Sequence, residues 1–576
     1  MRWIPGVVVT VFLGCFFAFA YWGHLSHAED YQLFQMTVDY FFDCVARPGG
    51  LVNYVARFLT QFFYYPVLGA FVIALLYGSM YYGVMLLYRD WDNAKNWIVS
   101  SVGVMLSLLA STLMLDLTAV YSGTLALVMT LWAVVLWRRC LVQKIRMMML
   151  PIVVFVVFWL IGGVAALAVV LFAICDMIVD RRRDMLSMMM VFVSLVVAVV
   201  MPFFARSVFG VQLPFRRVMF GADLSRFIAV VDPMVFVVYL VITILPLVGL
   251  LGKISKRMML GMSSLFVVGG VVAFVVNMSM YNEGNMRYCS YARKQNWREI
   301  LRLADEMSPT NRASLIYLNL SLGKTNTLGE NMFRYQQYGI DGLVHPFIME
   351  TNICLALSDV YYQLGFINSS ERMAFEGMKA VSDYQESVRC VERLAETNMI
   401  KGEYDVAIKY YTYLENTLFY KEKARVGLEY ARRRSIEGVG QWEEKRKCIM
   451  KDNFFFSENE HDMMLGLLFQ SNQQNKLAFD YLMAYCLLNR DVEHYVEYAP
   501  IGGHLYTTMP KAFREAYIYY LSLHNPQRLM NNNMGALDRN YVNRMQRFRD
   551  IYVKNPKDAR LSKDFSDTYW YYLLTE

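Results

Sequence analysis

The residues whose types and spacing are best suited to chemistry lie close to the N-terminus, in the stretch HLSHAEDY. It combines His24 and His27 with an adjacent pair of carboxylates, Glu29 and Asp30. Ionisable side chains beside a bilayer are costly to desolvate, so an acidic pair there is first a functional hypothesis. The alternative is that the pair is simply solvated or caps a helix starting near Tyr31. Two histidines without a third ligand at a fixed spacing are poor support for a metal site, and we predict none.

A second group of candidates is arginine-rich and lies in the stretch ARSVFGVQLPFRRVMFGADLSRF (205–227). Guanidinium groups bind phosphate through paired, fork-shaped hydrogen bonds, so Arg216 and Arg217 are suited to the phosphate of a lipid carrier. Snorkelling toward anionic lipid, or pairing with aspartates such as Asp223, would explain the same arginines. Asp116 lies at the end of an apolar run and joins the acidic pair as a candidate on the same side.

These residues would have to be positioned by a membrane domain. The composition indicates such a domain in the first half of the chain and a soluble one in the second. Hydrophobic residues make up 56% of the chain and charged residues 18%, with a mean hydropathy of +0.29. Residues 1–280 hold 19 Lys/Arg and 12 Asp/Glu, whereas residues 281–576 hold 37 of each. We therefore predict a polytopic membrane domain, 1–280, followed by a soluble domain, 281–576. The basic excess lies where cytoplasmic loops collect Lys and Arg, so no nucleic-acid partner is expected.

The membrane domain is expected to cross the bilayer nine times, because a spanning helix needs about 20 mostly apolar residues. The runs are 4–22, 62–88, 97–115, 118–137, 147–163, 164–180, 185–204, 227–251 and 258–277. The N-terminus and alternate connections hold 13 of the 19 basic residues, so the positive-inside rule places them in the cytoplasm. The second half of the chain then lies outside, in the periplasm of a bacterium. A cleavable signal peptide is the alternative for the first run, and it also leaves the acidic pair outside.

The first outer loop, residues 23–61, is long and only partly polar. Apolar residues recur at helical spacing from Leu33 to Val45, which predicts an amphipathic helix on the membrane surface. The sequence PGG at 48–50 interrupts this pattern, and LVNYVARFLTQFF then begins a second helix.

Residues 281–576 indicate short helices joined by polar turns, so the whole chain is predicted to be all-α. The stretch AETNMIKGEYDVAIKYYTYLE (395–415) fits the TPR pattern, with Gly402 at the turn. Weaker copies occupy 292–311, 355–380 and 469–499. Such repeats stack into an α-solenoid whose concave surface binds a protein or peptide partner. The nine cysteines are scattered, which argues against a disulfide framework.

This layout resembles the GT-C class of glycosyltransferases. Members combine a multi-pass membrane domain with acidic residues in a long first outer loop built of surface helices, and the O-mannosyltransferases with TPR tails continue into helical repeats. The motif that carries the resemblance is Glu29–Asp30. It implies transfer of a sugar from a polyprenyl-phosphate donor on the outer face. The chain also resembles an uncharacterised group of bacterial multi-pass membrane proteins, which implies no function.

The GT-C resemblance also implies roles for the candidate residues. Glu29 or Asp30 would be the general base toward an acceptor hydroxyl. Arg216 and Arg217 would stabilise charge on the leaving phosphate. His24 and His27 would assist as hydrogen-bond donors beside the substrate, and Asp116 would also line the substrate site.

Two function hypotheses follow for an inner-membrane protein with a periplasmic domain. The first is a GT-C-like transferase that moves a sugar from a polyprenyl-phosphate donor to an extracytoplasmic acceptor. The alternative is a non-enzymatic, membrane-anchored TPR-like scaffold of an envelope complex, which needs nothing special from the acidic pair. A transporter is a third hypothesis, and the scarcity of ionisable residues in the middle of the crossings argues against it. The sequence does not specify the sugar, the acceptor, the partner or a need for a divalent cation.

Overall fold

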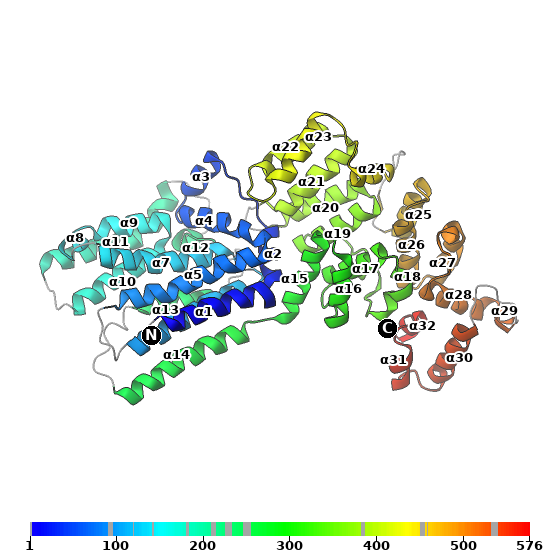
Figure 1. Cartoon of the computed structure of the whole chain (residues 1–576), viewed down its shortest axis with the longest axis horizontal. Coiled ribbons are helices and arrows are strands. Elements are labelled where there is room, and N and C mark those ends of the chain that lie inside the picture. The colour runs from blue at the N-terminus through cyan, green and yellow to red at the C-terminus, as the bar shows by residue number, and fades with distance from the viewer. Residues whose placement is uncertain are drawn as a thin grey trace. The chain divides into compact units, whose positions relative to one another are not determined.

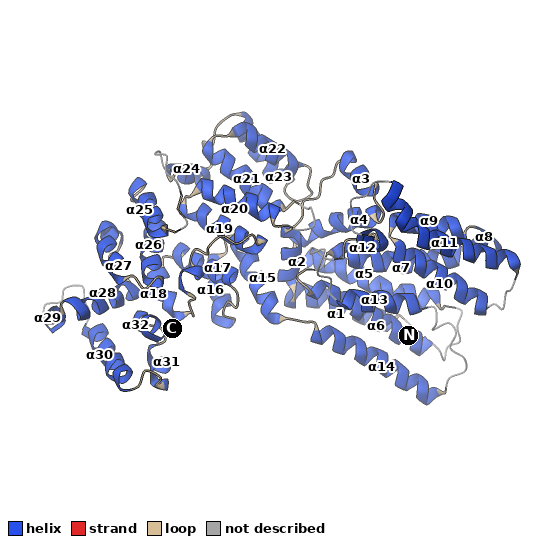
Figure 2. Cartoon of the chain, turned by 180° about the vertical axis from the view of Figure 1, so that it is seen from behind, coloured by secondary structure: helices blue, strands red, loops and turns tan. Residues whose placement is uncertain are grey.

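The structure is a computed structural model, and its described residues are all-α, with 80% in helices and no strand (Figure 2). This confirms the prediction that the chain is all-α. The described residues are 3–89, 96–118, 120–140, 143–179, 184–208, 215–224, 233–245, 255–381, 386–449, 456–457, 459–530 and 539–575. They form two compact units, each with its own apolar core. The first unit comprises Met1–Glu283 with two short later segments, Val381–Val388 and Tyr413–Glu422, and the second comprises the remainder.

The first unit contains the apolar helices. They are α1 (Ile4–Cys15), α5 (Pro66–Leu87), α6 (Asn96–Thr112), α7 (Tyr121–Cys140), α9 (Leu150–Leu160), α10 (Gly163–Val179), α11 (Met185–Val208), α13 (Pro233–Ile244) and α14 (Lys256–Val276). Two short helices with basic residues, α8 (Gln143–Met148) and α12 (Phe215–Phe220), lie between them in the sequence. Helices α1, α6 and α7 pack alongside α5, and α14 packs along α6 (Figure 1). Five described helices are long and apolar enough to cross a membrane. A sixth span is added if α1, the π-helical turn η1 (Phe16–Ala20) and α2 (Trp22–Asp30), bent by 73°, count as one.

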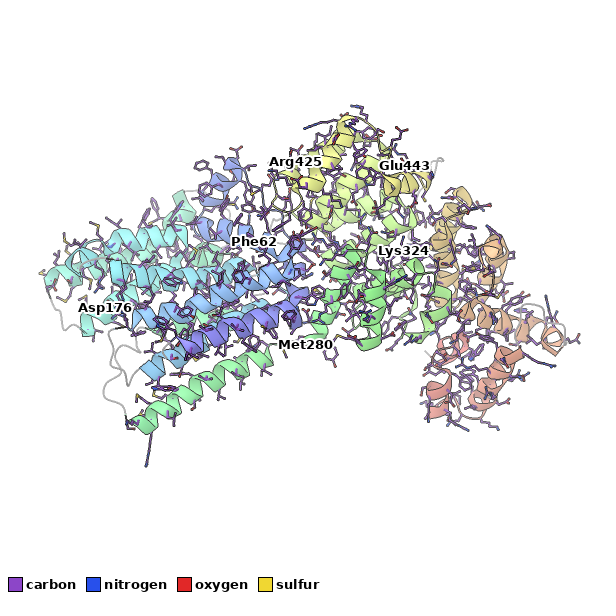
Figure 3. The ribbon with its side chains drawn as sticks, in the orientation of Figure 1. Phe62, Asp176, Met280, Lys324, Arg425 and Glu443 are labelled. Atoms are coloured by element: carbon purple, nitrogen blue, oxygen red, sulfur yellow. The ribbon has the colours of Figure 1, made fainter. Side chains whose placement is uncertain are left out.

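The nine predicted crossings each coincide with an apolar helix, although three of these helices, α9, α10 and α13, are short in the described residues. The predicted hairpin between α9 and α10 turns at Gly162, whose φ of 140° suits glycine. At the far end of α10, Asp176 (Figure 3) pairs with Arg138 at 3.1 Å and with Arg146 at 3.4 Å. A buried carboxylate between these apolar helices is therefore neutralised by cations from α7 and α8.

Residues 23–61 contain the two expected helices, but the first begins at Val38 and not near Leu33, because residues 32–37 are not helical. Helix α3 (Val38–Val45) begins at Thr37, whose hydroxyl accepts a hydrogen bond from the backbone N–H of Tyr40 at 3.3 Å. Helix α4 (Gly50–Thr60) follows Gly49, which has a φ of 73°, and leads into the 3₁₀ turn η2 (Gln61–Tyr64). The PGG interruption is thus confirmed as the break between the two helices.

The second half of the chain consists of helical hairpins. Its helices are α15 (Met280–Arg293), α16 (Trp297–Glu306), α17 (Arg312–Lys324), α18 (Leu328–Asn331), α19 (Thr351–Leu364), α20 (Ile367–Lys379), α21 (Val388–Lys401), α22 (Tyr404–Glu415), α23 (Lys421–Arg432), α24 (Gly440–Lys447), α25 (His461–Ser471), α26 (Lys476–Leu488), α27 (Val492–Tyr498), α28 (Lys511–His524), α29 (Pro526–Met530), α30 (Arg539–Lys554), α31 (Ala559–Phe565) and α32 (Tyr569–Thr575). Short 3₁₀ turns are η5 (Met332–Arg334), η6 (Gly339–Gly342) and η7 (Ala499–Leu505).

The turns of successive hairpins share a backbone feature. Left-handed residues occur at Gln295, Asn326, Gly365, Gly402 and Arg434, in steps of 31, 39, 37 and 32 residues. Each stands between the two helices of one pair, from α15–α16 to α23–α24. The helix pair expected around Gly402 is therefore present, and a residue with positive φ recurs in these turns at intervals of 31 to 39 residues.

Candidate functional site

The acidic pair lies on α2, and this helix begins where a distant carboxylate caps it. Glu283 accepts hydrogen bonds from the backbone N–H groups of Gly23 at 2.8 Å and His24 at 3.1 Å. The imidazole Nδ1 of His24 also lies 2.8 Å from the Glu283 carboxylate. The first N–H groups of a helix have no partner within it, and a negative charge there is favourable. Glu283 therefore explains why the chain resumes a helix at Trp22.

Glu29 and Asp30 occupy the last turn of α2, and both are buried, at 3% and 2% exposure. Residues 32–37, which follow, are not helical. The alternative that the pair is solvated or caps a helix starting near Tyr31 is therefore wrong. Carboxylates are disfavoured at a helix C-terminus, because the helix dipole is negative there. Their burial at this end requires compensating donors from elsewhere in the chain.

Tyr420 supplies a donor to Glu29. Its phenolic Oη lies 2.8 Å from Oε1 and 3.1 Å from Oε2 of the carboxylate, and the tyrosine is 6% exposed. Tyr420 belongs to the segment Tyr413–Glu422, which clusters with the first unit. A hydroxyl and a carboxylate are thus brought within hydrogen-bonding distance, although they are 391 residues apart in the sequence.

Asp30 also receives a donor from the second half of the chain. The hydroxyl of Ser387 donates to the backbone carbonyl of Asp30 at 2.6 Å. His27 lies on the same helix, and its ring centroid is 4.6 Å from that of Tyr31. The end of α2 is therefore enclosed by polar and aromatic groups.

The arginine candidates are not brought to the acidic pair by any described contact. Arg217 donates from Nε to Asp223 at 2.5 Å, and Arg57 lies 3.4 Å from the same carboxylate. For Arg217, the alternative of pairing with Asp223 is therefore the arrangement that the structure shows. Arg216 lies in α12, and its side chain is outside the described residues. The role of these arginines as a phosphate clamp stays a prediction.

Asp116 follows the 3₁₀ turn η3 (Leu113–Leu115) and is half-buried. Its carboxylate accepts hydrogen bonds from the backbone N–H of Thr118 at 3.0 Å and from its hydroxyl at 2.7 Å. This local pattern is that of an Asx turn, which holds the connection between α6 and α7. In the described part of the chain, no group of three His, Cys, Asp or Glu side chains could hold a metal ion.

The second unit contains an ionic pocket of about 70 Å³. It is lined by Ala292, Arg293, Gln295, Trp297, Asp359, Gln363, Arg389, Glu392, Arg393, Glu396 and Lys423. Asp359 accepts from Arg389, from Arg393 at 2.9 Å and from the hydroxyl of Tyr317 at 3.1 Å. Burial alone would raise the pKa of Asp359, but these two guanidinium groups hold that pKa below its ordinary value. The pocket therefore presents charged groups in fixed positions.

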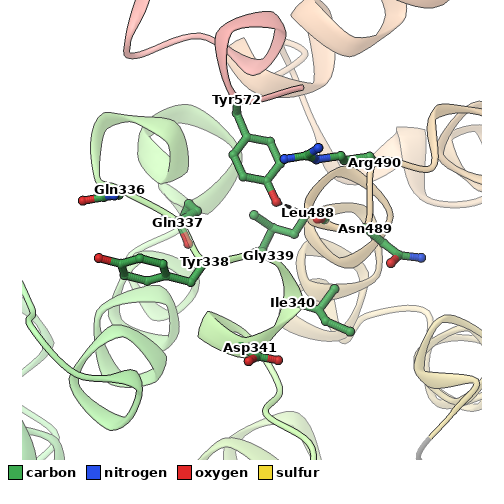
Figure 4. Close-up of a pocket in the computed structure, with 10 residues that line it drawn as sticks. All are labelled: Gln336, Gln337, Tyr338, Gly339, Ile340, Asp341, Leu488, Asn489, Arg490 and Tyr572. Atoms are coloured by element: carbon green, nitrogen blue, oxygen red, sulfur yellow. Dashed lines mark hydrogen bonds between the residues drawn. The ribbon is translucent and has the colours of Figure 1, made fainter. Parts of the chain in front are cut away.

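A larger pocket, of about 720 Å³, lies elsewhere in the second unit (Figure 4). It is lined by residues 336–341, by 488–490 and by Tyr572. The Tyr572 hydroxyl donates to the carbonyl of Leu488 at 2.7 Å, and the Arg490 guanidinium lies 5.4 Å from the tyrosine ring centroid. Both pockets are lined in part by charged side chains, so both are candidate binding surfaces of the second unit.

Sequence reasoning missed the partners of the acidic pair. Glu283, Ser387 and Tyr420 are far from it along the chain, so spacing does not reveal them. One signal was available for Tyr420, because the turn between α22 and α23 reads NTLFY. A turn between two soluble helices is usually polar, and three consecutive large apolar residues there indicate a buried contact.

The fold and this site define a helical protein, in its described residues, with apolar helices long enough to span a membrane and with an enclosed acidic pair at the end of α2. The whole chain, residues 1–576, matches the family model DUF6057, described as a family of unknown function, and the protein belongs to that family. No curated protein and no solved structure matches the chain.

Proposed function

We propose that the protein is a membrane glycosyltransferase of GT-C-like layout, with Glu29 as its general base. The observation that carries the proposal is the hydrogen bond between the buried Glu29 carboxylate and a hydroxyl, that of Tyr420. A general base must lie within hydrogen-bonding distance of the proton that it removes, about 2.6–3.2 Å between heavy atoms. Glu29 already holds a hydroxyl at that distance.

The proposed reaction transfers a sugar from a polyprenyl-phosphate donor to an acceptor hydroxyl. The acceptor oxygen attacks the anomeric carbon, and its proton passes to Glu29. The bond between that carbon and the phosphate oxygen breaks, and the polyprenyl phosphate leaves with the electron pair. Asp30 would adjust the charge beside the base, and Arg216 stays the candidate for the leaving phosphate, because the Arg217 guanidinium is held by Asp223.

The proposed setting is the bacterial inner membrane, crossed by nine helices, with residues 281–576 as a TPR-like solenoid in the periplasm. The basic residues of alternate connections support the orientation. The recurrence of left-handed turn residues supports repeats of the TPR kind, because each repeat then closes one helix pair in the same way.

A second candidate function is a non-enzymatic scaffold that binds a protein or peptide partner on its repeats. The ionic pocket favours it, because buried charges held in place by Asp359, Arg389 and Arg393 are suited to a charged partner. In this function the bond between Glu29 and Tyr420 would only hold the structure together.

A conservative substitution distinguishes the transferase from the scaffold. In a deletion strain of the native host, Glu29→Gln protein is expressed at the wild-type level and surface glycans are compared with those of wild type and deletion. Asp39→Asn is the matched control, because Asp39 lies in the same outer loop but is exposed. Loss of a glycan in the deletion and in Glu29→Gln, but not in the control, supports the transferase. A Glu29→Gln strain like wild type, with a full-length Lys423→Gln variant of the ionic pocket like the deletion, supports the scaffold.

A further inference from the structure

We propose that residues 416–420, with the sequence NTLFY, are an internal pseudo-substrate that occupies the acceptor position of the transferase. The acceptor is accordingly a hydroxyl-bearing side chain within a short peptide, preceded by an aromatic residue. This inference rests on the proposed function and adds to it the class of acceptor.

The hydroxyl of Tyr420 takes the place that the acceptor hydroxyl needs. It contacts both carboxylate oxygens of Glu29, at 2.8 and 3.1 Å, so an incoming hydroxyl cannot reach the base while this bond is made. Both residues are buried, at 3% exposure for Glu29 and 6% for Tyr420. The structure is therefore a closed state, in which the base is covered by a side chain of the same chemical type as the acceptor.

The main chain of the segment is bound as a peptide ligand would be. The carbonyl of Asn416 accepts from the backbone N–H of Met36 at 2.7 Å, and the N–H of Leu418 donates to the side-chain carbonyl of Gln61 at 2.9 Å. Hydrogen bonds to main-chain groups give affinity for a peptide without requiring a particular side chain. Both binding groups belong to the first outer loop, the same loop that carries Glu29.

The side chain of Phe419 supplies the specific contact. Its ring lies 5.7 Å from that of Tyr64 in a nearly parallel arrangement, with an interplanar angle of 8°. The rings of Phe62 and Tyr65 meet it edge-on at 5.8 and 5.3 Å. Aromatic pairs at these distances add to the gain from burial. This aromatic cradle therefore selects an aromatic residue directly before the hydroxyl-bearing one.

The segment 416–420 is the connection between two helices. It connects α22, which ends at Glu415, to α23, which begins at Lys421. The five residues between them are not helical. The N–H groups of Asn416, Thr417 and Tyr420 bond within α22 and the segment, whereas the carbonyl of Asn416 and the N–H of Leu418 bond to the first outer loop. A peptide acceptor entering the site would use the same donors and acceptors and would displace the segment.

The test uses membranes of the native host, which contain its own lipid-linked donors, from deletion strains expressing full-length variants. The probe is the synthetic peptide ENTLFYKE, residues 415–422, and the readout is a glycosyl mass increase assigned to its tyrosine by tandem mass spectrometry. Tyr420→Phe removes the covering hydroxyl and keeps the ring. We expect about tenfold more modified peptide than with wild type, because a hydrogen bond to a carboxylate no longer competes. Phe419→Ala, which removes the anchoring ring, is expected to act in the same direction.

The controls separate this inference from the proposed function. Tyr413→Phe changes an exposed tyrosine in the last turn of α22, just before the segment, and is expected to match wild type. The double variant Glu29→Gln/Tyr420→Phe is expected to leave the peptide unmodified. A probe with phenylalanine in place of its tyrosine is expected to stay unmodified with every variant. If Glu29→Gln loses the surface glycan but Tyr420→Phe membranes leave the peptide unmodified, or modify it no more than wild type, the pseudo-substrate inference is overturned and the transferase stands. If Glu29→Gln keeps the glycan, both are overturned.

Discussion

Glu515 is expected to make the second unit less stable as the pH rises. The residue lies in α28 and is fully buried, and its Oε2 accepts from the backbone N–H of Tyr569 at 2.8 Å. Its Oε1 has no hydrogen-bond partner among the described residues. Burial raises the pKa of Glu515 from 4.5 to about 8, although Lys511 and Arg544 oppose the shift. Both cations hold Asp567 instead, at 2.5 and 2.6 Å.

The sign follows from the two protonation states. Between pH 4.5 and 8 the unfolded chain releases a proton that the folded chain keeps, so the free energy of unfolding falls by about 1.4 kcal/mol per pH unit. Over the whole interval the loss is about 4–5 kcal/mol, and it levels off above pH 8. Glu515→Gln removes the titration and keeps a carbonyl oxygen for the N–H of Tyr569. The variant is therefore expected to gain about 4 kcal/mol relative to wild type between pH 5 and pH 8.5.

The assay is heat unfolding of the full-length protein in detergent, followed by tryptophan fluorescence at several pH values. Trp570 is fully buried next to Tyr569 and reports on this region. Between pH 5 and pH 8.5, the unfolding midpoint of Glu515→Gln is expected to rise by about 10 °C relative to that of wild type. Glu497→Gln, an exposed glutamate on α27, is the control and should follow wild type at every pH. A difference between Glu515→Gln and wild type that stays within about 0.5 kcal/mol throughout would show that the carboxyl is ionised in the folded chain.

Two further substitutions test the packing of the helix pairs. Asp359→Asn leaves Arg389 and Arg393 without their carboxylate, so the free energy of unfolding should fall by about 3–5 kcal/mol. Thermal melting at pH 7 measures this, and an unchanged midpoint would contradict the ion-pair argument. Gly427→Ala places a Cβ 2.4 Å from the ring of Tyr411 and should cost about 1–3 kcal/mol in the same assay. Gly440→Ala, which meets nothing within 4 Å, is its control, and equal midpoints for the two alanine variants would refute the close contact.

Much of the fold follows from local sequence signals. Apolar runs mark the apolar helices, the PGG sequence separates α3 from α4, and Gly402 marks the turn of the helix pair that best fits the repeat pattern. Each of these features depends on residues close together in the chain, through hydrophobic burial, positive φ or capping. For the same reason the all-α class could be predicted without knowledge of the tertiary contacts.

The ends of α2 could not be predicted in this way. The apolar run ends near Trp22, and HLSHAED has no strong helical pattern, so a helix there was not expected. It forms because Glu283, 260 residues from Gly23 in the sequence, satisfies the first N–H groups of the helix. Tertiary contacts routinely override local propensity, and here a single carboxylate sets the start of the element that carries the candidate base.

The hydrogen-bond partners of the acidic pair therefore decide whether it is a candidate base or an ordinary surface pair. Glu29 and Asp30 would be unremarkable in a solvated loop, but in the last turn of α2 they are buried where the helix dipole disfavours them. At this helix end the hydroxyl of Tyr420 donates to the Glu29 carboxylate, and the hydroxyl of Ser387 donates to the backbone carbonyl of Asp30. If those donors served stability alone, Tyr420→Phe would weaken the fold and leave the chemistry of the membranes unchanged. If they cover a base, the same substitution removes a competing hydroxyl, so its effect on peptide modification, and not its effect on stability, decides between the two roles.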